Sequence, residues 1–227
     1  MLEIMKDSKL FRDFRYNEVE AIIDIVKPQL IKLAPKEVLF DENEEINYIW
    51  LVSKGKLQSA RIQYDGTYQL NYLYSYGGIV GIDIAYTRTR LSPFHVSARE
   101  HTELYAIPYT ITSDENIPFE FRERISANII RVLANNLIKR QFKIDLLNKK
   151  SVRTRISMFL KFMSDKRDSH IFDIDIDREQ FAQYIGVNRS VLSHELSRMR
   201  SEGIINFHKG HFEILEMNSI NSESEEK

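Results

Sequence analysis

The residues best suited to chemistry in this sequence lie close together, in FAQYIGVNRSVLSHELSRMRSEGII at 181–205. Some of these side chains donate hydrogen bonds or are short enough to allow close approach, and one helix would place them on its outer face: Arg189, Ser190, Ser193, His194 and Ser197. A helix in the major groove of a DNA duplex presents its N-terminal residues to the base edges, and its positive end favours phosphate. These residues therefore predict a surface that contacts DNA.

The charge of this segment differs from that of the whole chain. Between Arg189 and Arg200 the only acid is Glu195, against three arginines, which leaves a local excess of two positive charges. The full chain of 227 residues has a formal net charge of −1. Since that total supplies no general attraction to nucleic acid, we expect any DNA contact to come from this local patch.

Two short helices are predicted to position these residues. Asp177 is expected to cap a helix over 178–185, and Asn188 a second helix over 189–201, with the break at Gly186. The two helices are expected to pack through small and apolar side chains: Phe181, Ala182 and Ile185 against Val191, Leu192 and Leu196.

A hairpin is predicted directly after the second helix. Gly203 ends that helix, and the strands of the hairpin run over 204–207 and 212–215. Two helices joined by a glycine-containing turn and followed by a hairpin form a winged helix-turn-helix. The alternative is a two-helix corner inside an enzyme, with Arg189 merely solvated.

A long helix is predicted before this domain, from about 118 to 148. It contains no glycine or proline after Pro118, and one apolar stripe recurs at spacings of three, four or seven: Ile130, Leu133, Leu137, Ile144 and Leu147. Such spacing is close to a heptad seam. We interpret the stripe as an interface with the same helix of a second chain. The alternative is a helix that lies on its own β domain.

The segment from about 38 to 107 is predicted to be β-structure. Short apolar runs alternate with turn signals, and Asp65-Gly66 is typical of a tight hairpin. Evenly spaced short strands indicate a small barrel or sandwich.

The composition restricts the remaining classes of protein. There is no cysteine, which excludes disulfides, thiolate nucleophiles and cysteine-ligated clusters. The N-terminus lacks the pattern of a secretion signal, and no apolar run approaches the roughly 20 residues of a membrane span. We therefore expect a cytoplasmic protein that does not enter a membrane.

The order of these segments, together with three motifs, resembles the Crp–Fnr family of bacterial transcription regulators. Residues 188–196 (NRSVLSHEL) fit the family's recognition segment, residues 51–56 (LVSKGK) look like its strand–turn element, and residues 77–81 (GGIVG) look like its glycine motif. The resemblance covers nearly the whole chain.

The resemblance implies an α+β fold with three parts. These are a cyclic-nucleotide-binding-like β-barrel (jelly roll) over 1–116, a dimerisation helix over 117–149 and a winged helix-turn-helix over 150–218. Residues 219–227, rich in serine, asparagine and glutamate, are predicted to form a disordered tail.

The resemblance also implies roles in DNA recognition. Arg189 would contact a guanine edge or a nearby phosphate, and Ser190 and His194 would be the other base readers. His194 departs from the family's usual arginine and cannot make the bidentate bond to guanine. The same interface would include Ser193, Ser197 and Asn188, and Lys209 in the wing and Arg153 are expected to contact phosphates.

The residues with which the family binds cyclic AMP are replaced in this sequence. Ile82 stands where a glutamate is needed, and Ser92 and Pro93 where an arginine and a serine are needed. A cyclic nucleotide would leave polar groups unpaired, so we expect no cyclic-AMP binding. A pocket for a different small effector is predicted with these lining residues: Tyr74, Ile82, Phe94, Arg140 and Gln141. The alternative is that these side chains belong to the core or to ion pairs.

Two other functions are weighed against this one. A cupin-like barrel enzyme would gather histidines and a carboxylate around a metal, and the sequence offers no His-x-His pair, glycine-rich phosphate loop or Gly-x-Ser-x-Gly elbow. A binding module without DNA contact is disfavoured by Arg189. We therefore expect no catalytic site, metal site or resident cofactor. The expected partners are a pseudo-palindromic duplex, a second copy of the chain and RNA polymerase.

Overall fold

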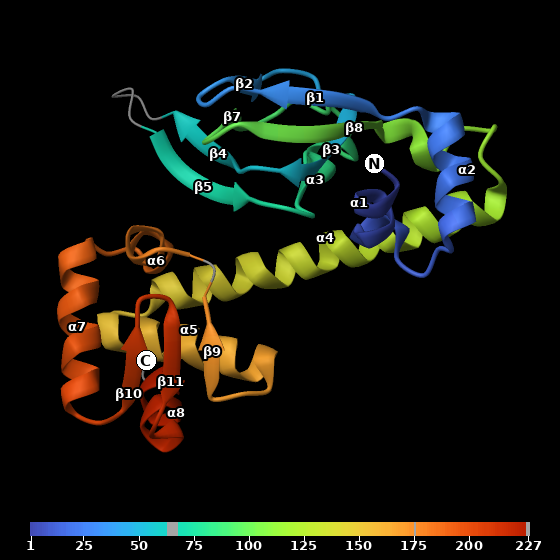
Figure 1. Ribbon diagram of the computed structural model, residues 1–227. Helices are drawn as coiled ribbons and strands as arrows, with labels where there is room; N and C mark the ends of the chain where they lie inside the picture. Colours follow the sequence, from blue (N-terminus) through green and yellow to red (C-terminus); the bar gives the residue numbers. More distant parts are fainter. Residues whose placement is uncertain (63–67, 175, 226–227) are drawn as a thin grey trace. The chain divides into compact units, whose positions relative to one another are not determined.

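The computed structural model describes residues 1–62, 68–174 and 176–225 (Figure 1). The chain forms two compact units, Met1–Asn135 and Asn136–Lys227, and helix α4 (Phe119–Asn148) runs from the first into the second. The long helix is therefore confirmed. It is not a segment apart, as the division at 117 and 149 implied, because each half of α4 packs into the core of one unit.

The first unit contains two antiparallel four-stranded sheets, ordered β1-β8-β3-β6 and β2-β7-β4-β5. Their strands are β1 (Gln29–Leu33), β2 (Val38–Phe40), β3 (Tyr48–Lys54), β4 (Leu57–Ile62), β5 (Tyr68–Tyr74), β6 (Ile79–Val80), β7 (His95–Ala98) and β8 (Thr102–Pro108). Within the described residues no strand ladder joins the two sheets. The expected β domain is therefore present, but its sheets do not close into a continuous barrel. The turn predicted at residues 65 and 66 lies outside the described residues.

The two sheets contact each other through aromatic side chains. Phe40 on β2 stacks on Trp50 of β3, with ring centroids 5.1 Å apart. Gly81, at φ +79°, lies against the same indole, and a Cβ atom there would meet Trp50 Cζ3 at 3.0 Å. Such crowding, together with a positive φ, explains why glycine occupies this position before the short helix α3 (Ile82–Ala85).

Helix α4 is attached to the first unit through its inner face. Ile125, Ile129 and Val132 are buried in the core of this unit. The buried amide of Asn128 donates hydrogen bonds to the carbonyl groups of Leu10 and Arg12, both at 3.0 Å. These contacts hold α4 to the N-terminal helices: α1 (Leu2–Asp7), η1 (Lys9–Phe11) and α2 (Tyr16–Val26). The strand β8 leads into α4 through η2 (Tyr109–Thr112).

In the described residues of the second unit, the four helices that follow α4 pack with a three-stranded sheet of order β10-β11-β9. Its elements after α4 are α5 (Val152–Arg167), β9 (Ile171–Asp173), α6 (Arg178–Ile185), α7 (Arg189–Ser201), β10 (Ile205–His208), β11 (His211–Ile214) and α8 (Met217–Glu225). The two predicted short helices and the hairpin are confirmed at these bounds. Phe181 and Phe212, both fully buried, belong to the hydrophobic core of this unit.

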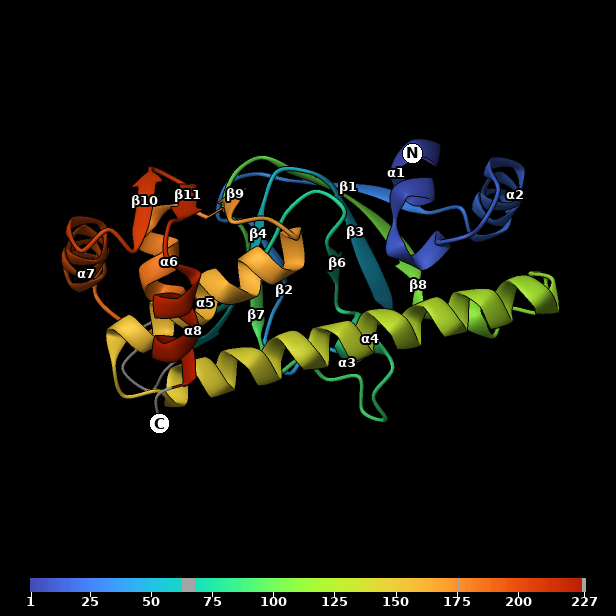
Figure 2. The ribbon, with the colours of Figure 1, turned by 90° about the horizontal axis from the view of Figure 1, so that it is seen from below.

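A disordered tail was predicted from residue 219, and for residues 219–225 this prediction is wrong. Helix α8 occupies this segment and packs on α5 (Figure 2). Ile220 is fully buried and Met217, three residues earlier, packs on the same core. Two apolar side chains at this spacing share one face of a helix, so they anchor a segment whose composition is otherwise typical of disorder.

In the part of the chain that the structure describes, no helix combines the length and the apolar character that crossing a membrane requires.

Replacing Ile220 with alanine tests the packing of α8. Loss of a fully buried isoleucine side chain is expected to lower the free energy of unfolding by about 2–4 kcal/mol. Denaturant unfolding followed by far-UV circular dichroism measures the change. The matched control is Leu215→Ala, because Leu215 is 52% exposed and should change stability by less than about 0.5 kcal/mol. If both substitutions lowered the free energy of unfolding by the same small amount, the packing of α8 through Ile220 would be contradicted.

Candidate nucleic-acid interface

The core of the second unit fixes which face of α7 points outward. Leu192, Leu196 and Met199 are fully buried, as are Phe181 and Ile185 on α6. These contacts confirm the predicted packing of the two helices, with one exception. Val191 was expected to face α6, but its side chain is 44% exposed. Its position on the helix lies about 100° from Leu192, outside the arc that α6 covers.

The outward face of α7 presents most of the predicted readers. Arg189, Ser190 and His194 are exposed. Ser193 is half-buried, and its carbonyl accepts a hydrogen bond from the exposed Ser197 hydroxyl at 2.9 Å. The hydroxyl hydrogen of Ser197 is therefore used within the helix, and its oxygen stays available as an acceptor.

The start of α7 differs in one detail from the expectation. Asn188 occupies the N-cap position, but its side chain makes no capping hydrogen bond, so the predicted cap is positional only. The backbone N–H groups of the first turn of a helix have no partner inside that helix. At the start of α7 the side chain of Asn188 satisfies none of them.

Arg178, the first residue of α6, is a cationic residue that the sequence analysis missed. Its guanidinium lies over the rings of Phe207 and Phe212, 5.0 and 5.8 Å from their centroids. It also donates a hydrogen bond to the carbonyl of Lys209 in the wing at 3.2 Å. The only sequence signal was its place directly after the cap Asp177.

Two cations approach each other at this end of the motif. Burial, and then the neighbouring charge of Arg189, lower the pKa of Arg178. No ion pair to an acid involves either arginine in the described parts of the chain. Lys209, at φ +53°, lies exposed at the tip of the adjacent wing. Arg178, Arg189 and Lys209 thus place three cationic side chains at this end of the motif, and such side chains bind anions such as phosphate groups.

Arg153 has a different environment from the one predicted. Its side chain is 18% exposed, and its Nε lies 2.9 Å from Oε1 of Glu195 on α7. Its Nη2 also contacts Glu202, which pairs in turn with Arg198 at 3.0 Å. The prediction of a phosphate contact is therefore withdrawn, because these carboxylates already engage the guanidinium. The same pair removes Glu195 from the outward face.

Arg155 joins the start of α5 to the turn of the motif. Its Nε donates to the carbonyl of Lys149 at 2.7 Å, and its Nη1 donates to the carbonyls of Ile185 and Gly186 at 3.1 and 3.4 Å. Gly186 itself has φ +71°, the left-handed region that favours glycine, and a Cβ atom there would lie 2.9 Å from Leu147 Cδ2, so that this side chain would have to move. No local pattern around Arg155 indicates this role.

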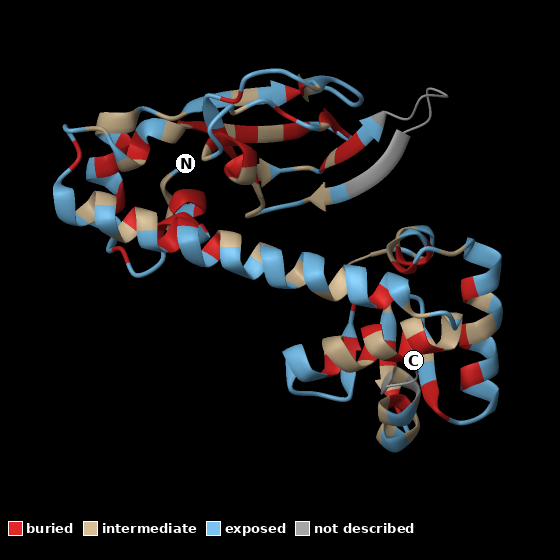
Figure 3. Ribbon diagram, turned by 180° about the vertical axis from the view of Figure 1, so that it is seen from behind, coloured by how far each residue is buried: buried red, intermediate tan, exposed pale blue. Residues whose placement is uncertain are grey.

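The outer face of α4 carries most of the predicted stripe. Figure 3 shows exposed positions recurring along this helix. Four of its members are exposed at 66, 68, 54 and 38%: Ile130, Leu137, Ile144 and Leu147. Ile138 and Phe119, which were not predicted, are also exposed, at 65 and 66%. Leu133 is half-buried and packs on the core of the first unit instead.

The residues of the predicted effector pocket are not gathered around a described cavity. Ile82 is 1% exposed in the core of the first unit, and Tyr74 and Phe94 pack against that core. Arg140 and Gln141 belong to the second unit, where the Gln141 amide donates to Asp145 at 3.0 Å. Ser92 is buried, and its hydroxyl donates to the carbonyl of Phe94 at 2.7 Å.

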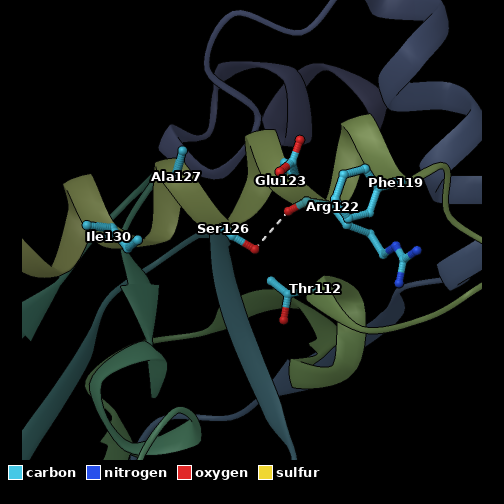
Figure 4. A pocket seen from close by; sticks show the side chains of 7 residues that line it. All are labelled: Thr112, Phe119, Arg122, Glu123, Ser126, Ala127 and Ile130. Atoms are coloured by element: carbon cyan, nitrogen blue, oxygen red, sulfur yellow. Dashed lines mark hydrogen bonds between the residues drawn. The ribbon is translucent and has the colours of Figure 1, made fainter.

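A shallow hollow of about 360 Å³ lies elsewhere in the first unit, beside the start of α4 (Figure 4). It is lined by Thr112, Phe119, Arg122, Glu123, Ser126, Ala127 and Ile130. The guanidinium of Arg122 points past Phe119 and away from Ser126 in this view, so the polar groups do not converge on one point.

Two parts of the chain match known domain families. Residues 30–112 match the cyclic nucleotide-binding domain, and residues 154–221 match the Crp-like helix-turn-helix domain.

Curated relatives match over most of their length. The anaerobic regulatory protein of Haemophilus influenzae is 24% identical over 225 residues, which cover 94% of this chain and 83% of that protein. The fumarate and nitrate reduction regulatory protein of Vibrio cholerae is 24% identical over 220 residues, covering 92% and 84%.

Solved structures share the fold at lower identity. FixK2 from Bradyrhizobium japonicum aligns with a TM-score of 0.62 at 16% identity, covering 88% of this chain and 98% of that one. A CooA mutant from Carboxydothermus hydrogenoformans aligns with a TM-score of 0.68 at 18% identity, covering 88% and 90%.

Replacing Arg153 with alanine tests whether this residue stabilises the domain or binds phosphate. The substitution leaves the largely buried Glu195 unpaired, so we expect the free energy of unfolding to fall by about 2 kcal/mol at neutral pH. Arg153 also lowers the pKa of Glu202 by hydrogen bonding. Stability gained in this way is present above the ordinary pKa of the carboxyl group and lost as the pH falls through its lowered value. The difference in the free energy of unfolding between the wild type and Arg153→Ala should therefore become smaller at acidic pH.

Urea unfolding at neutral and acidic pH measures this difference. Arg198→Ala is the control, because that side chain is 60% exposed in its pair with Glu202, and exposed ion pairs contribute little to stability. An Arg153→Ala protein of unchanged stability, with a weaker salt dependence of DNA binding, would restore the phosphate interpretation.

Proposed function

This chain belongs to the Crp–Fnr family of DNA-binding transcription regulators, and from that premise we propose that it acts as a homodimer on a pseudo-palindromic operator. The family matches are to transcription regulators and not to enzymes.

The observation that carries the DNA contact is the charge at the N-terminal end of α7. Arg189 and Arg178 lie close enough for one to lower the pKa of the other, and no acid pairs with either among the described residues. A phosphate group beside them, together with the free N–H groups of the helix start, would neutralise both charges. Lys209 would place a third cation on the neighbouring backbone.

Base recognition is assigned to the exposed face that follows. Arg189 can reach a guanine edge as well as a phosphate, and Ser190 and His194 lie one turn apart on the same side of α7. Ser193, Ser197 and Asn188 border this face and allow close approach. A histidine accepts or donates only one hydrogen bond on each ring nitrogen, so His194 cannot supply the two parallel bonds of an arginine to guanine.

The homodimer is proposed from the two apolar faces of α4. One face is buried in the first unit through Ile125, Ile129 and Val132. The other exposes Ile130, Leu137 and Ile144 at successive intervals of seven residues. A strict interval of seven is the spacing at which two helices wind around each other. Two chains joined in this way could hold their recognition helices about 34 Å apart, one turn of the duplex.

A small effector other than cyclic AMP is proposed to modulate the dimer. Ile82 offers neither charge nor hydrogen bond to a ribose, and the sequence supplies no cysteine for an iron–sulfur cluster. The proposed site is the first unit, where the partly buried Tyr74 and Phe94 pack against the core. Contact with RNA polymerase in the cytoplasm is part of the same proposal.

Replacing Arg189 with alanine tests the DNA contact. Loss of one base-edge or phosphate contact is expected to cost about 1–3 kcal/mol of binding free energy, which is roughly a 5- to 150-fold weaker affinity. Selection from a random DNA pool identifies the preferred site, and fluorescence anisotropy at fixed salt measures affinity. The control is Arg99→Ala, an exposed arginine of the first unit. Equal affinities of both variants, or a wild-type protein that selects no sequence, would refute the proposal.

Replacing Leu137 with aspartate tests the dimer. A carboxylate at the centre of the proposed seam would face its own copy, so we expect the dissociation constant of the dimer to rise by about a hundredfold or more. Sedimentation equilibrium measures the mass across micromolar concentrations. Leu30→Asp provides a control on β1, where Leu30 is 47% exposed. A wild-type protein that sediments as a monomer would refute the dimer and leave the DNA contact of one domain standing.

A further inference from the structure

We propose that Val191 determines part of the sequence preference by contacting the methyl group of a thymine in the major groove. The inference rests on the proposed function, because it assumes that α7 enters the groove. Val191 is the third residue of α7, and 44% of its side chain is exposed. It is the one large apolar side chain on the outward face of this helix.

The packing of the second unit leaves the Val191 methyl groups free for a partner. The buried side of α7 is formed by Leu192, Leu196 and Met199, and Val191 is absent from the hydrophobic core that these residues share. Glu195, one turn further along, is held by Arg153 at 2.9 Å. The acid nearest to Val191 on the helix surface is therefore neutralised and turned toward α5.

The position of Val191 relative to the other readers favours a base contact. Residues three apart lie on the same side of a helix, so Val191 and His194 are neighbours on the outward face. Both lie in the first two turns of α7, the part of a recognition helix that approaches the base edges. Side chains of a helix also tilt toward its N-terminus, which brings Val191 closer to that end.

The chemistry of the groove limits what an aliphatic side chain can recognise there. The edges of guanine, cytosine and adenine present hydrogen-bond donors and acceptors, and only thymine adds a methyl group. An isolated exposed valine elsewhere on a protein surface needs no explanation. On a face otherwise composed of arginine, serine and histidine, a valine beside a polar base edge would cover donors and acceptors without bonding to them, which weakens binding. Beside the methyl group of thymine the same side chain would strengthen binding.

The operator is therefore expected to contain a thymine in each half-site opposite Val191. Because His194 cannot replace arginine as a reader of guanine, this apolar contact would supply a share of the discrimination that the family's arginine would otherwise provide.

Replacing thymine with deoxyuridine tests the contact without changing base pairing. Random-pool selection with the full-length protein first defines the half-site, and each thymine in it is then replaced in both half-sites by deoxyuridine, which lacks only the methyl group. At one thymine position, wild-type protein is expected to bind the uridine duplex about fourfold more weakly per half-site, the factor that corresponds to one buried methyl group. For Val191→Ser the thymine and uridine duplexes should bind equally.

The matched control is Val38→Ser, because Val38 is 45% exposed on β2 in the first unit. This variant should keep the wild-type loss on uridine substitution. Absence of any uridine effect in the wild type, or its persistence in Val191→Ser, would overturn the inference while leaving sequence-specific binding intact. A pool from which the wild type enriches no sequence would overturn the proposed function and the inference with it.

Discussion

The recognition motif depends on hydrogen-bond donors for the carbonyl groups that end α6. A helix leaves its last carbonyls without partners, and here the chain turns at once into α7, which leaves no room for a longer cap. The backbone N–H groups of Gly186 and Val187 satisfy part of this demand by returning to α6. Arg155 supplies the rest, and the same guanidinium binds the carbonyl of Lys149 beyond the end of α4. One side chain therefore fixes the turn and the start of α5 together.

Much of the fold was predictable because its signals are local. The bounds of α6 and α7 follow from Asp177, Gly186 and Gly203, each of which acts on its own neighbours in the sequence. The length of α4 follows from the absence of helix-breaking residues over thirty positions. The β domain was predictable in its strands but not in its closure, because the pairing of β2 with β7 joins residues far apart in the chain.

The errors concern side chains whose partners are distant in sequence. Arg153 is followed by no acid within one helical turn, so nothing nearby indicated its pairing with Glu195 and Glu202. The composition of the last residues suggested disorder, although two apolar side chains of α8, Met217 and Ile220, pack on the core of the second unit. Val191 was assigned to the interior from its residue type, although its angular position on α7 places it outside the buried arc.

The contact between Phe40 and Trp50 has a consequence for spectroscopy. Trp50 is the only tryptophan of the chain, and it is 6% exposed between the two sheets. Indole emission depends on the polarity around the ring, so the tryptophan fluorescence of this protein originates from the interior of the first unit alone. Events confined to the helix-turn-helix leave that signal unchanged, whereas any loosening of the sheets shifts it toward longer wavelengths. The protein thus carries a built-in optical label for one half of its structure.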